Sequence, residues 1–332
     1  MNMEAVRRGC VGFCLILAGG VLNAWAPVQA QSGPYPTKPI RFLIANAPGG
    51  GLDITARVTG PTVSTALGQQ LIYDNRAGAT GSLAAETVAR SAPDGYTIMV
   101  GAIGNLAVNP HLYKGLGYHP ITDLAPVIFA VSGSNVLVVH PTLPVKSVQE
   151  LITYLRKQPG ALTYGSSGSG NAGHLAAELF CSMTKTKMVH VPYKGGAPAM
   201  TAMLSGEVQL IFASPPTAQA QIKAGRVKGL AVTTARRSLV LPELPTIAES
   251  GLAGYETDNW YGIVVAAKTP RPIIDRLNKE FSRALNMPDI KEALLRTGLE
   301  TAPGTPEAFG AYMKSEYEKW GRLIADAGIP AN

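Results

Sequence analysis

Charge clusters and metal-ligand spacings are scarce in this sequence. Charged residues make up 15% of the 332 positions, and a net charge of +7 is spread along the chain. Outside the N-terminal segment the nearest approach to a basic cluster is the pair Arg236-Arg237, so we expect no nucleic-acid partner. The histidines are scattered and match no metal-binding spacing, which predicts no metal and no cofactor: His111, His119, His140, His174 and His190.

The N-terminal segment has the features of a secretory signal peptide. Arg7 and Arg8 give a positive start, and the apolar stretch from Val11 to Leu22 is too short to span a bilayer. Val28-Gln29-Ala30 then supplies small residues for cleavage. We therefore expect residues 1–30 to be removed and the protein to reach the periplasm.

Cysteine is also scarce, with three residues in the whole chain. Cys10 and Cys14 would leave with the signal peptide, so the mature protein is expected to have no internal disulfide. The remaining Cys181 follows an apolar pattern typical of a helix face, which predicts a buried structural thiol rather than a reactive one.

Short β-rich runs alternate with helical patterns after the signal peptide. This alternation is typical of βαβ units and predicts an α/β fold with parallel-rich sheets. The capping box from Ser147 to Glu150 predicts a helix over Val148–Lys157, and Thr305-Pro306 is a second helix start. The predicted strands are Ile40–Ala45, Gln70–Asp74, Tyr96–Ala102, Val127–Val131, Asn135–His140, Leu162–Gly165, Met188–Val191, Val208–Ala213, Lys228–Thr233 and Tyr261–Ala266.

The chain length suits two domains of ordinary size. No low-complexity linker separates them, so we expect two lobes joined by strands that cross between them. The first lobe would comprise residues 35–132 and 235–332, and the second residues 133–234. The chain would cross near Val131–Val138 and return near Leu230–Thr234.

Two glycine-rich segments follow predicted strands and precede predicted helices, namely Ala47–Asp53 and Gly165–Gly173. Glycine lets the backbone approach a ligand closely, and a helix N-terminus offers free N–H groups and a positive dipole end. Such a turn binds a carboxylate or phosphate without a charged side chain. Neither segment contains Lys or Arg, so amides and hydroxyls would have to hold the anion.

The second segment also contains a G-x-G-x-x-G pattern in Gly168, Gly170 and Gly173. This pattern permits an alternative function as a nucleotide-dependent oxidoreductase. However, the following strand Met188–Val191 lacks the acidic residue that a dinucleotide site requires. Hydrolase patterns are incomplete as well, because Ser169 stands where the nucleophile elbow needs glycine. The residues therefore favour a binding protein over an enzyme.

Short segments along nearly the whole mature chain resemble the Bug family of periplasmic solute receptors, the binding components of tripartite tricarboxylate transporters. Their order and spacing together make the resemblance specific. The segments are Tyr35–Ile40, Pro48–Asp53, Asp74–Ala79, Ala92–Thr97, Tyr164–Gly168, His190–Gly195, Leu230–Thr233, Leu244–Gly251 and Trp260–Gly262.

The resemblance implies a two-lobed Venus-flytrap fold in which a small organic carboxylate lies between the two glycine-rich segments. It also implies that the protein delivers this ligand to the membrane subunits of a transporter. We expect a monomer, and signalling to a sensor kinase is an alternative role. The implied ligand contacts are Ala47, Gly49, Gly50, Asp53, Gly101, Asn105, Ser166, Ser167, Gly168 and Ala213.

Two of these positions carry a further expectation. Asp53 lies in the first turn of a predicted helix, where a carboxylate commonly caps backbone amides instead of meeting a ligand. Ala213 stands where many members of the family have Asp. Because Ala213 cannot pair with an ammonium group, we expect an acid without an amine to be preferred over an amino acid.

Overall fold

The computed structural model describes residues 35–326, so the predicted signal peptide lies outside the described residues. The strands are β1 (Ile40–Ile44), β2 (Leu71–Asn75), β3 (Thr97–Ala102), β4 (Leu124–Gly133), β5 (Val136–Val139), β6 (Thr163–Ser166), β7 (Val189–Pro192), β8 (Leu210–Ala213), β9 (Lys228–Val232), β10 (Asn259–Ala266) and β11 (Glu300–Thr301). All ten predicted strands are present, and β11 is an addition.

The helices lie between most of these strands, as the alternating pattern predicts. They are α1 (Gly51–Leu67), α2 (Ser82–Ala89), α3 (Asn109–Leu112), α4 (Val148–Lys157), α5 (Ala172–Thr184), α6 (Gly196–Leu204), α7 (Pro215–Lys223), α8 (Arg271–Leu285), α9 (Pro288–Leu295) and α10 (Pro306–Asp326), with short turns η1 (Ala79–Gly81) and η2 (Gly104–Val108). Among residues 35–326, none of the helices has the length and apolar character needed to cross a membrane.

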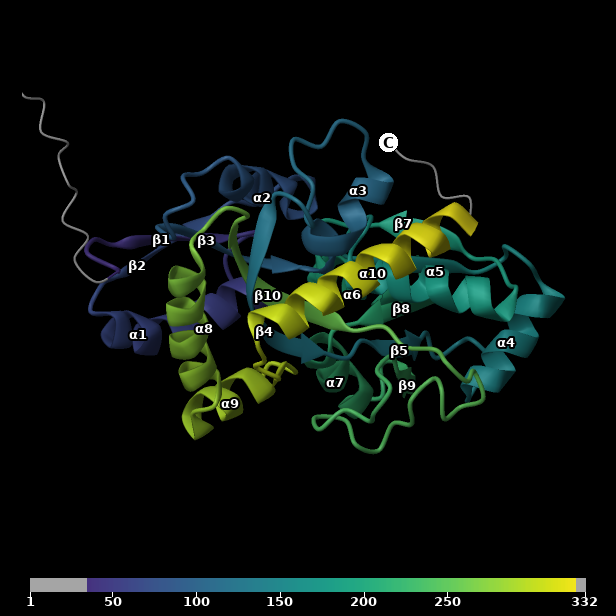
Figure 1. The fold of residues 1–332 in the computed structure, drawn as a ribbon. Coiled ribbons are helices and arrows are strands. Elements are labelled where there is room, and N and C mark those ends of the chain that lie inside the picture. The colour runs from purple at the N-terminus through teal and green to yellow at the C-terminus, as the bar shows by residue number, and fades with distance from the viewer. Residues whose placement is uncertain (1–34, 327–332) are drawn as a thin grey trace, which may run out of the picture. The chain divides into compact units, whose positions relative to one another are not determined.

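The strands form two sheets of the same design (Figure 1). The first has the order β11-β4-β10-β3-β1-β2, and the second has the order β7-β6-β8-β5-β9. In each sheet the first strand of a βαβαβ unit lies between the other two, so β6 corresponds to β1. The two-lobed α/β prediction is therefore confirmed.

The sheets are mixed rather than parallel-rich, which corrects one detail of the sequence-based expectation. β1, β2 and β3 run parallel, as do β6, β7 and β8. However, β10 is antiparallel to β3 and β4, and β5 is antiparallel to β8 and β9. The antiparallel pairs arise because β10 and β5 enter each sheet directly after the chain has crossed from the other one.

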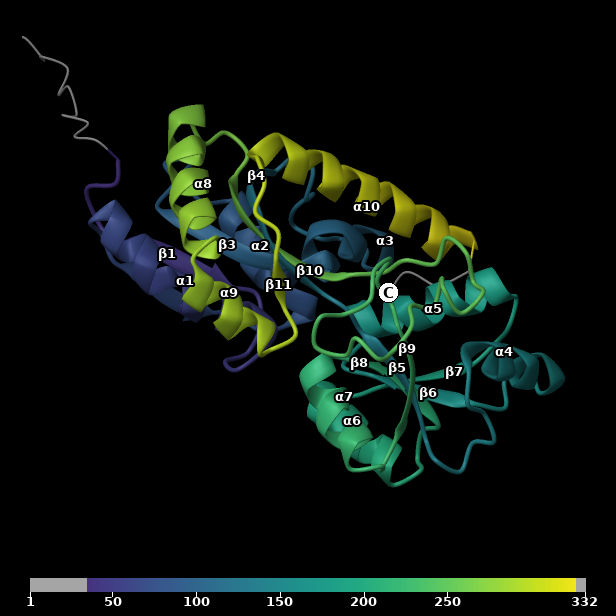
Figure 2. The ribbon, with the colours of Figure 1, turned by 90° about the horizontal axis from the view of Figure 1, so that it is seen from below.

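The second sheet is buried on both faces, which explains its continuous apolar strands. Along β5, Leu137 and Val139 face a core with α4 and α5. The alternate residues Val136 and Val138 face a second core with α6. This alternation is the ordinary pleat of a strand, and it fixes which helices cover each face (Figure 2).

Packing places the return crossing later than the sequence suggests. The chain leaves the first sheet after Gly133, within the predicted range. On the way back, Leu241, Ile247 and Tyr255 still pack into the cores of the second sheet. Because residues 235–258 were assigned to the first lobe, we propose that the boundary lies near Asn259 instead.

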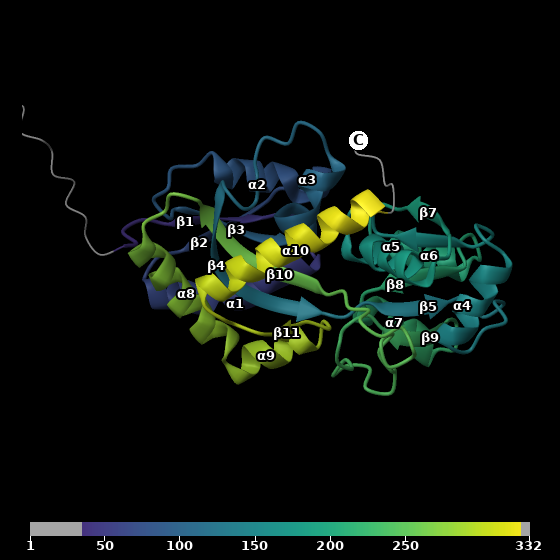
Figure 3. The same ribbon diagram turned by 45° about the vertical axis from the view of Figure 1, so that its right-hand side comes forward.

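Helix α10 begins as predicted, because the Thr305 hydroxyl accepts a hydrogen bond from Ala308 N at 3.2 Å. It runs along β4 and ends beside α5 (Figure 3). Its aromatic residues Phe309 and Trp320 are buried, and Tyr312 and Tyr317 are half-buried. Thr305-Pro306 therefore starts the element that packs along both parts of the fold.

Candidate ligand-binding cleft

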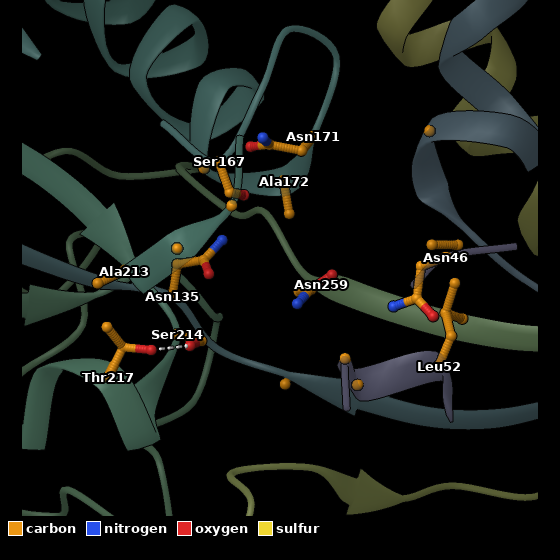
Figure 4. A pocket seen from close by; sticks show the side chains of 18 of the residues that line it. Asn46, Leu52, Asn135, Ser167, Asn171, Ala172, Ala213, Ser214, Thr217 and Asn259 are labelled. Atoms are coloured by element: carbon orange, nitrogen blue, oxygen red, sulfur yellow. Dashed lines mark hydrogen bonds between the residues drawn. The ribbon is translucent and has the colours of Figure 1, made fainter. Parts of the chain in front are cut away.

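A cleft with a volume of about 780 Å³ is lined by residues of both sheets. This size lies within the range of small-molecule sites. Figure 4 shows Asn46 and Leu52 on one side, Ser167, Asn171 and Ala213 on the other, and Asn259 between them. The cleft therefore lies where a ligand would touch both parts of the fold at once.

The position of the cleft follows from the strand topology. In a βαβ unit every strand leads at its carboxyl end into a helix, so the helix N-termini gather at one edge of the sheet. The starts of α1, α5 and α6 all contribute lining residues. These N-termini supply backbone N–H groups and the positive ends of three helix dipoles.

The first glycine-rich loop is held by a carboxylate from inside the helix. Asp53 accepts a hydrogen bond from Gly49 N at 2.9 Å, from Asn75 Nδ2 at 3.0 Å and from Arg57 Nε at 2.8 Å. Burial alone would raise the pKa of Asp53, but these hydrogen bonds outweigh burial and hold the pKa below its usual value. Asp53 therefore stays ionised and fixes the backbone ahead of α1.

No side chain caps the N-terminus of α1, whose N-cap residue is Gly50. A Cβ atom on Gly50 would lie 2.2 Å from Asn46 Nδ2, so only glycine lets the Asn46 amide pack against this turn. The first turn of α1 consequently presents backbone amides toward the cleft rather than to a side-chain cap.

The second glycine-rich loop is held by its own side chains. Asn171 caps α5 by accepting from His174 N at 3.0 Å, and His174 Nδ1 accepts from Gly170 N at 3.0 Å. Ser166 Oγ accepts from Gly168 N at 3.2 Å. This loop is therefore shaped before any ligand arrives.

Two stacked histidines, His174 and His190, contact the second loop through hydrogen bonds. Residue His190 on β7 lies opposite Tyr164 in the sheet, and its ring stacks on that of His174 with centroids 4.1 Å apart. His190 Nε2 lies 2.7 Å from Ser166 Oγ. Burial lowers the pKa of His174 to about 3, with the neighbouring His190 adding to the effect, and burial lowers the pKa of His190 to about 4. Both imidazoles are neutral at physiological pH.

The remaining thiol shows no sign of reactivity. Cys181 lies on α5 as predicted, although it is half-buried rather than fully buried. Burial, followed by the charge of Glu178, raises the pKa of the thiol to about 12. A thiol with this pKa is a poor nucleophile at neutral pH.

Most of the residues expected to contact a ligand line the cleft. Those residues are Ala47, Gly49, Gly50, Asn105, Ser166, Ser167 and Ala213. Of these, Asn105 already uses its side chain, because Oδ1 accepts from Ala102 N at 3.2 Å. Their role as ligand contacts stays a prediction.

Three of the expected residues lie behind the lining. Asp53 is 4% exposed and serves as an anchor for the loop, in line with its expected capping role. Gly101 packs closely against the side chain of Asn105. A Cβ atom on Gly101 would lie 2.5 Å from Asn105 Oδ1, so a larger residue would displace that side chain. Gly168 has φ of +135°, a conformation that favours glycine, and it shapes the turn without lining the cleft.

Several lining residues were missed. The Gly195-Gly196 pair at the start of α6 has the same strand, glycine and helix context that identified the other two loops, so sequence alone could have found it. Ser134, Asn135 and Asn259 lie at the crossings between the sheets. No local pattern marks them, because their position depends on contacts between distant strands.

The lining is mostly apolar and almost uncharged. Among the described residues, the charged side chain that lines the cleft is that of the exposed Arg296, and no acidic side chain lines it. Side-chain amides are frequent instead: Asn46, Asn105, Asn135, Asn171 and Asn259. Such a surface suits a small anion that is held by neutral donors.

The glycines of the G-x-G-x-x-G pattern have structural roles that need no nucleotide. Gly168 and Gly170 have positive φ values of +135° and +78°. Gly173 is the point where α5 approaches β8, since a Cβ there would lie 2.7 Å from the Phe212 carbonyl oxygen. Backbone geometry and helix packing therefore account for all three positions.

Comparison with known proteins decides the family. The family model of the tripartite tricarboxylate transporter family receptor matches residues 55–329. The chain belongs to this family. The resemblance to Bug receptors is confirmed as well, because protein BugT of Bordetella pertussis is 32% identical over 329 residues, covering 99% of each chain.

Solved structures of other receptors match this family member over most of its length. The R. palustris protein Rpa4515, solved with adipate, is 37% identical with a TM-score of 0.80, covering 90% of this chain and 100% of that one. MatC from Rhodopseudomonas palustris, with bound malate, is 28% identical with a TM-score of 0.76, covering 87% and 100%. Family and fold are thus those of solute-binding receptors, which favours this class over the oxidoreductase alternative.

Proposed function

We propose that this protein captures a small carboxylate in the periplasm between the starts of α1 and α5 and passes it to the membrane subunits of a tripartite tricarboxylate-type transporter. One observation carries the proposal: the N-termini of α1, α5 and α6 meet in a cleft that no acidic side chain lines among the described residues.

Helix N-termini suit a carboxylate for a physical reason. Each presents amide N–H groups with the equivalent of about half a positive charge. In a cleft shielded from water such donors interact with an anion more strongly than they would in bulk solvent. Gly50 and Gly173 line the cleft at the starts of α1 and α5, so the amides of both helix starts lie beside the space that a carboxylate would occupy.

The ligand class is narrowed by the relatives and by the cleft. Rpa4515 was solved with adipate and MatC with malate. Adipate and malate are both dicarboxylates. Ala213 ends β8 in the lining and offers no counter-charge, while Asp53 is occupied behind the first loop. A ligand ammonium group would be buried without a partner here, which is costly. We therefore propose an amine-free acid, with dicarboxylates as the first class to test.

A thermal-shift screen of paired acids tests the proposal. Succinate and aspartate differ only in the amine, and adipate and adipamide differ only in their charged groups. A ligand present at 100 times its Kd adds about 2.7 kcal/mol to the free energy of unfolding. We expect succinate or adipate to raise the melting temperature more than aspartate or adipamide does. Equal shifts within both pairs would contradict the proposal.

A loop variant with a matched control tests the location. In Gly50→Val the new side chain would displace Asn46 and crowd the start of α1, so binding of the best acid should fall at least tenfold. Gly304→Val is the control, because the nearest atom to its Cβ, that of Ala308, lies 4.0 Å away and the residue does not line the cleft. Unchanged affinity in Gly50→Val would place the ligand elsewhere.

A further inference from the structure

A second hollow, smaller than the cleft, lies next to it on the first lobe. It has a volume of about 510 Å³ and is lined by residues from the end of β2, from the segment that follows β2 and from α2. Ala77 lines both this hollow and the cleft. The segment after β2 therefore borders the ligand-binding cleft and the hollow at the same time.

Two exposed apolar side chains lie on the elements that form this hollow. Leu83 lines it and is 51% exposed. It also lies at the rim of the cleft, because a Cβ atom on the cleft residue Gly78 would lie 3.1 Å from Leu83 Cδ1. Ile72 is 53% exposed and is on the same face of the edge strand β2 as Asp74, which lines the hollow. Isolated exposed apolar residues are common, but two of them beside one hollow mark a surface that another molecule can cover.

Arginines surround the hollow and outnumber the carboxylates that pair with them. Arg41 Nε and Arg76 Nε both donate to the same oxygen, Asp74 Oδ2, at 2.9 Å and 3.3 Å. Two cations thus share one anion. Arg90 Nη2 lies 2.7 Å from Glu86 Oε1, and the Arg90 side chain is 68% exposed. The hollow therefore has an apolar residue in its lining and an excess of positive charge around it.

The exposure of the hollow argues against a small-molecule site. Pockets for small molecules bury most of the ligand surface, whereas Leu83 is half exposed and Arg90 largely exposed. The residue types point to a protein partner, because arginine is enriched and lysine depleted where proteins bind one another. Both cations of the described lining, Arg76 and Arg90, are arginines.

We propose that the hollow between β2 and α2 is the docking surface for the membrane subunits of the transporter, through a periplasmic segment that carries apolar and acidic side chains. An apolar side chain would cover Leu83, and a carboxylate would meet the excess charge at Arg76 and Arg90. The position suits delivery, because a docked subunit would touch the segment that borders the ligand. This inference rests on the proposed function, which supplies the membrane subunits as partner.

Uptake into proteoliposomes that contain the purified membrane subunits tests the docking surface. The labelled probe is succinate or adipate, whichever gives the larger thermal shift. In Leu83→Asp the uptake at limiting receptor concentration should fall at least tenfold, because a charge replaces the apolar contact. Asp is well tolerated in the first turn of a helix, where Leu83 lies in α2. Calorimetry on the free variant should give the wild-type affinity for the same acid, since Leu83 does not line the cleft.

Leu239→Asp is the matched control for this substitution. Leu239 is 65% exposed and lines neither the hollow nor the cleft. Its variant should support uptake at the wild-type rate. An equal loss of uptake in Leu239→Asp and Leu83→Asp would overturn the assignment of docking to the hollow.

A charge reversal tests the positive side of the hollow. Arg90 and Lys314 are both exposed and pair with a glutamate one helical turn away, Glu86 and Glu318 respectively. Arg90→Glu should lower uptake about tenfold and weaken its dependence on salt concentration. Lys314→Glu makes the same change in charge on α10 and should alter neither. Equal responses of the two variants would show that the total charge, and not the hollow, governs docking.

A second copy of the chain is the competing occupant of the hollow. Sedimentation of the wild type at increasing concentration measures self-association. We expect no dimer that depends on Leu83. A wild-type dimer that Leu83→Asp dissociates, together with unchanged uptake, would make the hollow an interface between copies and overturn the proposal.

Failure of this inference can be told apart from failure of the proposed function. If the wild type binds no small carboxylate, capture fails; if it binds one but supports no uptake, delivery fails and the docking surface with it. If the wild type supports uptake and the Leu83 and Arg90 variants support it equally well, capture and delivery stand and the docking surface is refuted.

Discussion

The two glycine-rich loops occupy equivalent places in the fold and are built in different ways. One follows β1 and the other follows β6, the corresponding strand of the second sheet. The first leaves α1 without a side-chain cap and is anchored by Asp53 from within the helix. The second is held by Ser166 and His174, which accept from two backbone amides of the loop, and by Asn171, which accepts from His174 N at the start of α5.

This difference assigns different tasks to the two loops. The second loop uses several of its donors to define its own shape, so we expect it to act as a rigid wall. The first loop keeps the amides at the start of α1 available for an anion. We therefore expect the first loop to contribute most to recognition of the ligand's negative charge. The second loop should contribute most to recognition of the ligand's shape.

The anchor of the first loop gives the largest expected effect. Asp53→Ala removes a buried carboxylate that accepts hydrogen bonds from Gly49 N, Asn75 Nδ2 and Arg57 Nε. We expect the free energy of unfolding to fall by about 2–3 kcal/mol. Because the loop loses its anchor, ligand affinity should fall as well. Urea unfolding and calorimetry measure the two effects.

Glu150 offers a control for this substitution. It occupies the same position in the first turn of α4, and its side chain accepts from Lys146 N at 2.7 Å, as Asp53 accepts from Gly49 N. Glu150 is exposed and far from the lining. Glu150→Ala should cost less than about 1 kcal/mol and leave affinity unchanged. Equal costs at the two sites would show that the first loop has no special anchor.

The histidines of the second loop give a smaller effect that depends on pH. The folded pKa of His190 is lowered to about 4, against 6.5 for a free imidazole. Between these values the unfolded chain binds a proton that the folded chain does not, so stability falls as pH drops from 6.5 to 4. The loss for one imidazole is about 2 kcal/mol between pH 6.5 and 5.

His190→Gln should remove this part of the pH dependence. Asp258 works in the opposite direction, because burial and the nearby Glu256 and Glu316 raise its pKa to about 7, and it adds stability as pH falls below 7. The comparison must therefore be made between wild type and variant at each pH. The stability advantage of the wild type should shrink between pH 7 and pH 5; parallel curves would contradict a neutral buried His190.

Asp53→Asn sharpens the contrast between the loops. The pKa of Asp53 is lowered, so its contribution to stability is present above pH 3.8 and is lost only as pH falls below that value. Between pH 7 and pH 5, Asp53→Asn should lower stability by a constant amount. A changing difference in this window would assign part of the pH dependence to the first loop.

The smallest expected effect is that of the cap on α5. Asn171→Ala removes the acceptor for His174 N, and helix caps of this kind contribute about 1 kcal/mol. Asn171→Asp keeps an acceptor and should retain most of that stability. If Asn171→Ala unfolds at the same urea concentration as the wild type, the second loop does not depend on its cap.

Much of the fold could be predicted from local patterns. Strands were found because apolar runs such as Val208–Ala213 are bounded by turns, and the α4 start was found from its capping residues. Glu150 completes that capping interaction at Lys146 N rather than at Ser147 N, a shift of one residue. The two-residue strand β11 was missed because it is too short to show any periodicity.

The site could be predicted only where glycine marks it. The loops before α1 and α5 were identified from glycine and their strand and helix context. The floor of the cleft was not, because Asn135 gains its position from Thr233, which lies 98 residues away along the chain. The later boundary that we propose for the return crossing has the same origin, since residues such as Tyr255 are held by contacts with α5 that no local pattern reveals.

A crystal structure of the protein with the acid that binds most tightly in the thermal-shift screen tests the central claim most directly. The account predicts one carboxylate within hydrogen-bond distance of backbone amides at the starts of both α1 and α5, with no acidic side chain in contact. A ligand carboxylate that contacts only one of these helix starts, or that lies outside the cleft, would contradict it.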